Sequence, residues 1–238
     1  FLAGRLFTFG CHPEAAVRAV DIQLSENSSS FCIRSPWGEV PVHLHLAGRF
    51  NVSNALGAFS VCGALGVPME QMAAALEKMT CVPGRLERVE DPRGRHVFVD
   101  YAHTEDALRN VLQTLRETSI GRLICVFGCG GNRDRSKRPR MGAAVSELAD
   151  FAVVTSDNPR NENPQDILNE ILAGMDPGKP HRVEPDRARA IGAALQAAGP
   201  GDTLLIAGKG HETYQEVAGR MTHFDDREVV RNLLAEGL

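Results

Sequence analysis

The sequence predicts an α/β protein whose larger, C-terminal part is a Rossmann-like domain with a mainly parallel sheet. Beyond about residue 84, short apolar runs alternate with amphipathic stretches, which is the pattern of successive βαβ crossovers. The earlier part shows strand-like runs followed by two helices instead. Val82-Pro83-Gly84, which has the composition of a linker, separates the two patterns. We therefore expect two domains, residues 1–83 and 84–238.

The first block begins with short strands and ends with helices. Strands are expected over Val17 to Leu24, Phe31 to Arg34 and Pro41 to Leu46, separated by turn-rich segments. Helices are expected over Asn51 to Leu65 and Met69 to Met79. Because these elements resemble the end of a domain, we expect that its beginning, and the native N-terminus, lie before Phe1. The apolar faces should hold Val52, Ala55, Leu56, Phe59 and Cys62 in the first helix, and Met72, Ala75, Leu76 and Met79 in the second.

The second block contains the elements of an open parallel sheet. In such a sheet ligands bind at the carboxyl ends of the strands, so the segments that follow the strands are the candidates for chemistry. A hairpin over Tyr214 to Phe224, turning at Gly219, and a last helix from about Arg227 complete the chain. The expected strands are His96 to Asp100, Arg122 to Phe127, Phe151 to Thr155, His181 to Val183 and Thr203 to Ala207, and the expected helices are Glu105 to Glu117, Lys137 to Leu148, Pro164 to Ala173 and Arg187 to Ala198.

Composition excludes several classes of protein. A net charge of -4 argues against a general nucleic-acid binder, and no apolar run approaches the ~20 residues that cross a bilayer. The first ten residues lack the features of a secretory signal. None of the 6 cysteines forms a Cys-x-x-Cys pair, which favours a reduced, cytoplasmic protein. His43 and His45 share a strand face, but no third metal ligand is placed nearby, so we expect a half-exposed pair.

A glycine-rich, basic segment follows the strand that ends at Phe127. Its glycines let backbone N–H groups approach an anion, although a plain tight connection explains them equally well. The segment is neither a dinucleotide fingerprint, whose third glycine is replaced by Arg133, nor a Walker A loop. The basic cluster favours a carboxylate or phosphate site, although we expect some of its residues to be only a solvated helix start. The cluster consists of Arg133, Arg135, Lys137 and Arg138.

The segment after the next strand carries both an acidic and a basic side chain. Asp157, Asn158, Pro159 and Arg160 follow the strand that ends at Thr155. The first three are turn-formers, so a structural role accounts for them, whereas the Arg160 guanidinium suits a bidentate carboxylate contact. Asp157 suits an ammonium, and the combination suits an amino-acid-like ligand.

Glycines and a second acidic residue follow the strand that ends at Ala207. Gly208 permits close approach of a ligand, and Glu212 offers another acceptor for an ammonium. We expect His211 to be a local hydrogen-bond partner. After the first strand of this block, Asp100 is either a turn residue or a support for magnesium or phosphate, and Thr104 is placed to cap the next helix.

Taken in order, these segments resemble the Mur ligases, the ATP-dependent enzymes that build the peptidoglycan stem peptide. The resemblance runs from about Gly48 to the C-terminus and is weaker before that. It is carried by Asp100-Tyr101-Ala102-His103, Phe127-Gly128-Cys129-Gly130-Gly131-Asn132-Arg133-Asp134, Asp157-Asn158-Pro159-Arg160 and Ala207-Gly208-Lys209-Gly210-His211-Glu212. This combination is similar to that of the diaminopimelate-adding members of the family.

The resemblance implies two sets of site residues. Residues on the nucleotide side would include the asparagines of the segment Phe50 to Ala58. Diaminopimelate has an amino acid head at each end, and Arg160 would pair with the distal carboxylate, which lysine lacks. The set for diaminopimelate is Arg133, Asp157, Asn158, Pro159, Arg160, Gly208 and Glu212, and the set for ATP is Asn51, Asn54, Arg85, Asp100 and His103.

The resemblance also implies what this chain lacks. The family's phosphate loop, magnesium ligands, carbamylated lysine and UDP-binding domain precede the position of Phe1, so no catalytic or metal-binding residue is expected here. The implied partners of the whole ligase are ATP, magnesium, meso-diaminopimelate and UDP-MurNAc-L-Ala-D-Glu. The alternatives are a lysine-adding Mur ligase, a folylpolyglutamate synthetase, or a Rossmann-like nucleotide-binding module without catalysis.

Overall fold

The computed structural model describes residues 6–25 and 28–238, and it divides into two compact units, Phe1–Val82 and Pro83–Leu238. The expectation that the chain opens without a signal sequence falls partly on residues 1–5, outside the described residues. Each unit has its own sheet and its own apolar core, so each is described separately.

The first unit is built on a four-stranded sheet in the order β1-β2-β3-β4. The short strand β1 (Phe9–Gly10) is parallel to β2 (Val17–Leu24), while β3 (Ser29–Ser35) and β4 (Gly38–Leu44) continue the sheet in antiparallel fashion. The three longer strands confirm the sequence prediction. Strand β1 was missed because two residues are too few to show an alternating pattern.

Two helices, α1 (Arg49–Ala64) and α2 (Met69–Glu77), supply the other half of this core. Valine, leucine and phenylalanine of α1 face the sheet as predicted. In α2 the buried alanine is Ala73, whereas the predicted Ala75 and Met79 are exposed. The buried face of α2 is therefore narrower than the predicted face and rotated from it. It consists of Met72, Ala73 and Leu76, which contact the core.

The second unit contains a six-stranded sheet in the order β5-β6-β10-β7-β8-β9. All neighbouring pairs are parallel except β5 with β6. Placing the late strand β10 between β6 and β7 brings the loop that follows it to the centre of the sheet edge. The strands are β5 (Glu87–Val89), β6 (His96–Asp100), β7 (Leu123–Phe127), β8 (Phe151–Val154), β9 (His181–Val183) and β10 (Thr203–Ala207).

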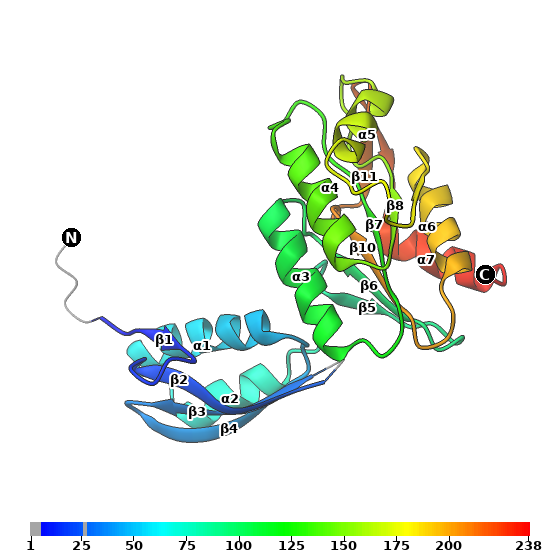
Figure 1. The fold of residues 1–238 in the computed structure, drawn as a ribbon. Coiled ribbons are helices and arrows are strands. Elements are labelled where there is room, and N and C mark those ends of the chain that lie inside the picture. The colour runs from blue at the N-terminus through cyan, green and yellow to red at the C-terminus, as the bar shows by residue number, and fades with distance from the viewer. Residues whose placement is uncertain (1–5, 26–27) are drawn as a thin grey trace. The chain divides into compact units, whose positions relative to one another are not determined.

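Helices cover both faces of this sheet, which confirms the predicted Rossmann-like class. The neighbours α3, α4 and α5 pack on one face, and α6 and α7 on the other (Figure 1). The capping residue Thr104 accepts a hydrogen bond from Ala107 N at 3.3 Å, as predicted. The bounds are α3 (Glu105–Thr118), α4 (Lys137–Leu148), α5 (Pro164–Leu172), α6 (Arg187–Ala197) and α7 (Asp226–Ala235), with a hairpin of β11 (Tyr214–Val217) and β12 (Arg220–His223).

A buried ion pair joins the helices of one face to the strand ends. Arg187 and Asp226, the first residues of α6 and α7, are both inaccessible to solvent and contact each other at 2.7 and 2.8 Å. Burial alone would lower the pKa of Arg187, but nearby negative charge, chiefly that of Asp226 with its hydrogen bonds, opposes this and the pKa is raised overall. The same guanidinium donates to the carbonyls of Ala207 at 3.0 Å and Ser156 at 3.3 Å. The Arg187 guanidinium thereby pairs with backbone carbonyls where the parallel strands β8 and β10 end.

We predict that residues 83–238 fold without the first unit, because their core is continuous within the unit. A protein beginning at Pro83 should be soluble and should unfold in one cooperative thermal transition, followed by circular dichroism. An insoluble product, or one that lacks fixed tertiary signals, would show that the unit depends on the preceding residues.

We also predict that Arg187→Met destabilises this unit by about 3–5 kcal/mol, since it leaves the Asp226 carboxylate buried without its cation. Urea unfolding of the single variant and of Arg187→Met/Asp226→Leu measures the effect. The double variant should recover a large part of the loss. Equal stability of the wild type and the single variant would contradict the role given to the pair.

Candidate functional site

A polar cavity of about 270 Å³ lies at the carboxyl ends of the central strands of the second unit. Loops after β6, β7, β8 and β10, together with β11, supply its walls. Most residues of the predicted amino-acid site meet here. The lining is Tyr101, His103, Cys129, Gly130, Arg133, Lys137, Asp157, Asn158, Arg160, Gly208, Glu212 and Tyr214.

Glycines allow two of these loops to pack backbone against backbone. A Cβ added to Gly128 would lie 2.2 Å from the carbonyl oxygen of Thr155, and one added to Gly131 would lie 1.9 Å from that of Pro159. The N–H of Gly131 donates to the Asn158 carbonyl at 2.8 Å. These glycines therefore join the loops after β7 and β8. Pro159 is buried in that contact and is absent from the cavity lining.

Two carboxylates form the acidic side of the cavity. Asp157 is only 7% exposed, and its Oδ1 lies 3.4 Å from the Lys209 ammonium without a well-formed hydrogen bond to any described residue. A Cβ at Gly208 would come within 3.1 Å of Oδ2, so this glycine keeps the space beside the carboxylate open. Glu212 accepts a hydrogen bond from Asn158 Nδ2 at 3.0 Å.

The basic side of the cavity contains two guanidinium groups, one with internal partners and one exposed at the rim. Arg160 donates from Nη1 to the Gly131 carbonyl at 2.8 Å, and its Nε lies 3.3 Å from Glu216 Oε2. Its backbone, at φ 53°, exchanges hydrogen bonds with β11 and the following turn. Arg133 is exposed at the rim, and within the described residues its side chain has no ion-pair partner.

The remaining residues of the predicted basic cluster have internal partners. Lys137 donates to the carbonyl of His103 at 2.9 Å. Arg135 pairs with Glu170. Arg138 is fully buried and contacts Glu162 at 2.9 Å and Glu170 at 2.8 Å, and its hydrogen bond lowers the pKa of Glu162 to about 2. The expectation that only part of this cluster faces a ligand is consistent with these contacts.

The candidates for the nucleotide side fall into two groups. In the second unit, the Arg85 guanidinium lies 5.2 Å from the centre of the Tyr101 ring, and the His103 ring lies 4.5 Å from it. In the first unit, Asn51 Nδ2 donates to the Ala47 carbonyl at 2.9 Å, and the exposed Asn54 lies one turn along α1.

Asp100 serves as a local support. Both of its carboxylate oxygens accept backbone hydrogen bonds at 2.7 Å, one from Leu86 N and one from Ala102 N. Burial raises its pKa, and those hydrogen bonds oppose the rise. These contacts describe a turn residue at the end of β6. Within the described ranges no group of histidine, cysteine and acidic side chains is arranged to hold a metal ion.

His43 and His45, expected to be half-exposed, are both exposed and lie side by side. The rings of His43 and His45 lie 4.8 Å apart, and His43 Nδ1 is 2.8 Å from Ser30 Oγ. The cysteines are free thiols, and burial raises the pKa of Cys129 to about 12. Over residues 6–25 and 28–238, no helix is both long and apolar enough to cross a membrane.

Sequence reasoning missed three contributors to the site: Lys209, Tyr101 and Tyr214. All three lie in or beside quoted motifs, but a lysine between two glycines gives no sign of being buried. Lys209 is in fact fully buried beneath Asp157 and Asn158. The only signal available was its position one residue after Gly208, at the end of a central strand.

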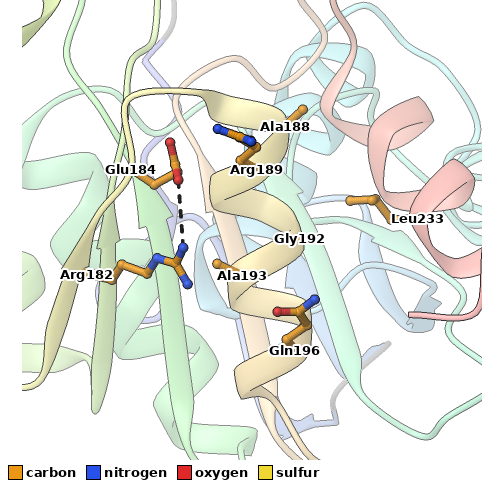
Figure 2. Close-up of a pocket in the computed structure, with 8 residues that line it drawn as sticks. All are labelled: Arg182, Glu184, Ala188, Arg189, Gly192, Ala193, Gln196 and Leu233. Carbon is orange, nitrogen blue, oxygen red and sulfur yellow. Dashed lines mark ion pairs between the residues drawn. The ribbon is translucent and has the colours of Figure 1, made fainter.

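A larger hollow of about 540 Å³ lies elsewhere on this unit, along β9, α6 and α7 (Figure 2). Arg182 and Glu184 on its rim form an ion pair at 3.8 Å, and small residues of α6 line its floor. It lies along α6 and α7 and not among the loops after β6, β7, β8 and β10, and its one carboxylate, Glu184, is already paired with Arg182. We therefore take the smaller cavity as the candidate site.

Both parts of the chain are similar to domains of known proteins. The model of the Mur ligase glutamate ligase domain matches residues 84–210, and that of the Mur ligase middle domain matches residues 3–62. UDP-N-acetylmuramoyl-L-alanyl-D-glutamate–2,6-diaminopimelate ligases are similar throughout. That of Thermosynechococcus vestitus is 50% identical over 98% of this chain and 48% of its own length, and that of Synechococcus elongatus is 46% identical over 98% and 47%.

Solved structures show the same fold. A diaminopimelate ligase of this name matches with a TM-score of 0.68 and 37% identity, covering 97% of this chain and 47% of its own. Folylpolyglutamate synthase of Mycobacterium tuberculosis matches with a TM-score of 0.70, 22% identity and coverage of 93% and 48%, which shows the fold alone. The chain spans about half the length of the relatives it matches. With both domain models matched in order and half of its residues shared with one ligase, this chain belongs to the Mur ligase family.

Proposed function

We propose that this chain is the amino-acid-binding part of an ATP-dependent ligase that adds meso-2,6-diaminopimelate to UDP-MurNAc-L-Ala-D-Glu in the cytoplasm. One observation carries the proposal: a single cavity brings two carboxylates, Asp157 and Glu212, to face two guanidinium groups, Arg133 and Arg160. An amino acid head has an ammonium and a carboxylate close together, so it complements this arrangement.

The number of guanidinium groups supports a ligand with a second carboxylate. Arg133 has no internal partner among the described residues, and Arg160 keeps Nη2 free after Glu216 and Gly131 have taken its other groups. Lysine ends in a single ammonium and would leave such a group without a counterpart. A site that hydrogen-bonds a substrate group rejects analogues lacking that group strongly, because its own polar atoms are then left unpaired.

In this proposal the residues of the cavity bind and orient the amino acid, and they exclude alternatives. ATP supplies the phosphoryl group that activates the D-glutamate side-chain carboxylate. The amine of diaminopimelate then attacks the acyl carbon, phosphate leaves, and the nitrogen loses a proton. The resemblance to Mur ligases implies that magnesium and most of ATP would be held by parts of the ligase outside this chain. Asn51, Asn54, Arg85 and His103 are proposed for the adenosine side, and Asp100 would hold the backbone beside Arg85 and His103.

The decisive experiment is phosphate release by the complete ligase with ATP and UDP-MurNAc-L-Ala-D-Glu, comparing meso-diaminopimelate, lysine and glutamate as acceptors. Diaminopimelate should support turnover far better than the others. A preference for lysine would favour a lysine-adding ligase. Tight binding of NAD or a nucleotide that diaminopimelate leaves unchanged, with no turnover, would favour a non-catalytic module.

We predict that the 238-residue chain by itself has neither ligase nor ATPase activity, because its sequence has no Gly-Lys-Ser/Thr phosphate loop. Phosphate release by the purified chain should equal the background without protein. Diaminopimelate-dependent release above that background would overturn the prediction.

We further predict that Arg160→Ala in the complete ligase raises the KM for diaminopimelate by ~30- to 5,000-fold, the range expected when one partner of a desolvated ion pair is removed. The KM for ATP should change little. The kcat/KM with lysine, a poor substrate, should not fall in parallel with that for diaminopimelate. The preference for diaminopimelate over lysine should therefore decrease.

A matched control is Glu216→Gln, which removes the internal partner of Arg160 but leaves its guanidinium. If Arg160 binds substrate, this control should alter the KM for diaminopimelate by no more than a few-fold. If Arg160 only braces β11 against the loop after β8, both variants should behave alike and every substrate should suffer equally.

A further inference from the structure

Lys209 is a buried cation directly beneath the proposed amino-acid site. It follows Gly208 at the end of β10, and its side chain is inaccessible to solvent. Burial lowers the pKa of its ammonium, while the nearby Asp157 carboxylate opposes that effect. Burying a lysine costs free energy unless its donors are used, so its contacts show what the residue does.

The ammonium connects three parts of the cavity wall. It donates to Asn158 Oδ1 at 2.9 Å and to the Tyr214 carbonyl at 2.7 Å, and it lies 3.4 Å from Asp157 Oδ1. The rings of Tyr214 and Phe224 lie within 5.8 and 5.9 Å of it. The loops after β8 and β10 and the strand β11 therefore meet at one charged nitrogen.

These contacts also set the orientation of the Asn158 amide. Oδ1 accepts from Lys209 Nζ and, at 3.1 Å, from Glu216 N, and both of these groups are donors only. The opposite edge of the amide must then present Nδ2, which donates to Glu212 Oε2 at 3.0 Å. With the amide reversed, Nδ2 would face two donors and the amide oxygen would face a carboxylate.

We propose that Lys209 is a positioning residue for the amino-acid substrate: it holds Asn158 so that Asn158 in turn holds the Glu212 carboxylate at the cavity, facing the substrate ammonium. This inference rests on the proposed function. It adds a determinant that never touches the ligand, and it explains why a cation is retained at a depth where an apolar side chain of similar size would pack without desolvation.

The test uses Lys209→Met in the complete ligase, with Arg95→Met as a matched control. Arg95 is also a buried cation, with one carboxylate partner (Asp91) and two backbone carbonyl partners (Leu195 and Leu238), but it precedes β6 at the opposite edge of the sheet. Lys209→Met should raise the KM for diaminopimelate ~10- to 100-fold, with kcat and the KM for ATP within about 3-fold of wild type. Arg95→Met should leave both KM values within that margin, even where it lowers the melting temperature as much.

A second variant keeps the inference testable if Lys209→Met fails to fold. Asn158→Asp retains the acceptors for Lys209 and Glu216 N but removes the donor to Glu212. It should raise the KM for diaminopimelate as Lys209→Met does. In the double variant the two effects should not multiply, since both act on one link.

Each outcome has a definite meaning. An unchanged diaminopimelate KM in Lys209→Met or in Asn158→Asp would overturn the positioning role and leave the proposed function intact. An equal loss for ATP and diaminopimelate, matched by Arg95→Met, would show that Lys209 serves stability only. If the wild type prefers another amino acid, the substrate in the proposed function is wrong. The effect of the same variants on the KM for that amino acid then tests the role of Lys209.

Discussion

The buried pair between Arg187 and Asp226 is the interaction on which the site depends. Parallel strands end with carbonyl groups that have no partner in the sheet, and burying such groups unpaired is costly. Arg187 donates to two of them, Ser156 and Ala207, while Asp226 balances its charge. These carbonyls immediately precede Asp157 and Gly208. The loops that form the cavity therefore start from points fixed by a cation at the beginning of α6.

Close backbone contact supplies the second constraint. At Gly128, Gly131 and Gly84 an added Cβ would lie about 2 Å from a backbone atom of another loop: 2.2, 1.9 and 2.1 Å, respectively. Larger residues would separate the loops and widen the cavity between them. The glycine-rich motif after β7 thus has a packing role, and its neighbour Gly130 faces the cavity. Charged side chains can then converge because the backbones beneath them are in contact.

Charge in the second unit is divided between internal networks and the cavity. Arg138, in the first turn of α4, pairs internally with Glu162 and Glu170. Arg133, a few residues earlier, keeps its guanidinium at the cavity rim. This division leaves unpaired charge at the cavity, which the proposed ligand with two amino acid heads would require.

The sequence by itself determined the class of fold, the order of nearly all elements and the loops that line the cavity. Alternating apolar runs and amphipathic helices are local signals, and so are the capping residue Thr104 and the motifs after β7, β8 and β10. Strand β5 was missed because Glu87-Arg88-Val89 is short and mostly charged. Its extended conformation is visible only in its antiparallel pairing with β6.

Only the tertiary structure decided which side chains of those loops are available. Arg133 and Arg138 look alike in the sequence, yet one is exposed at the cavity and the other is fully buried, because partners 24 and 32 residues away surround the second. The same holds for Lys209, whose partner Asn158 is 51 residues away. Local sequence specifies the backbone pattern, whereas burial and charge pairing arise from contacts between loops that are distant along the chain.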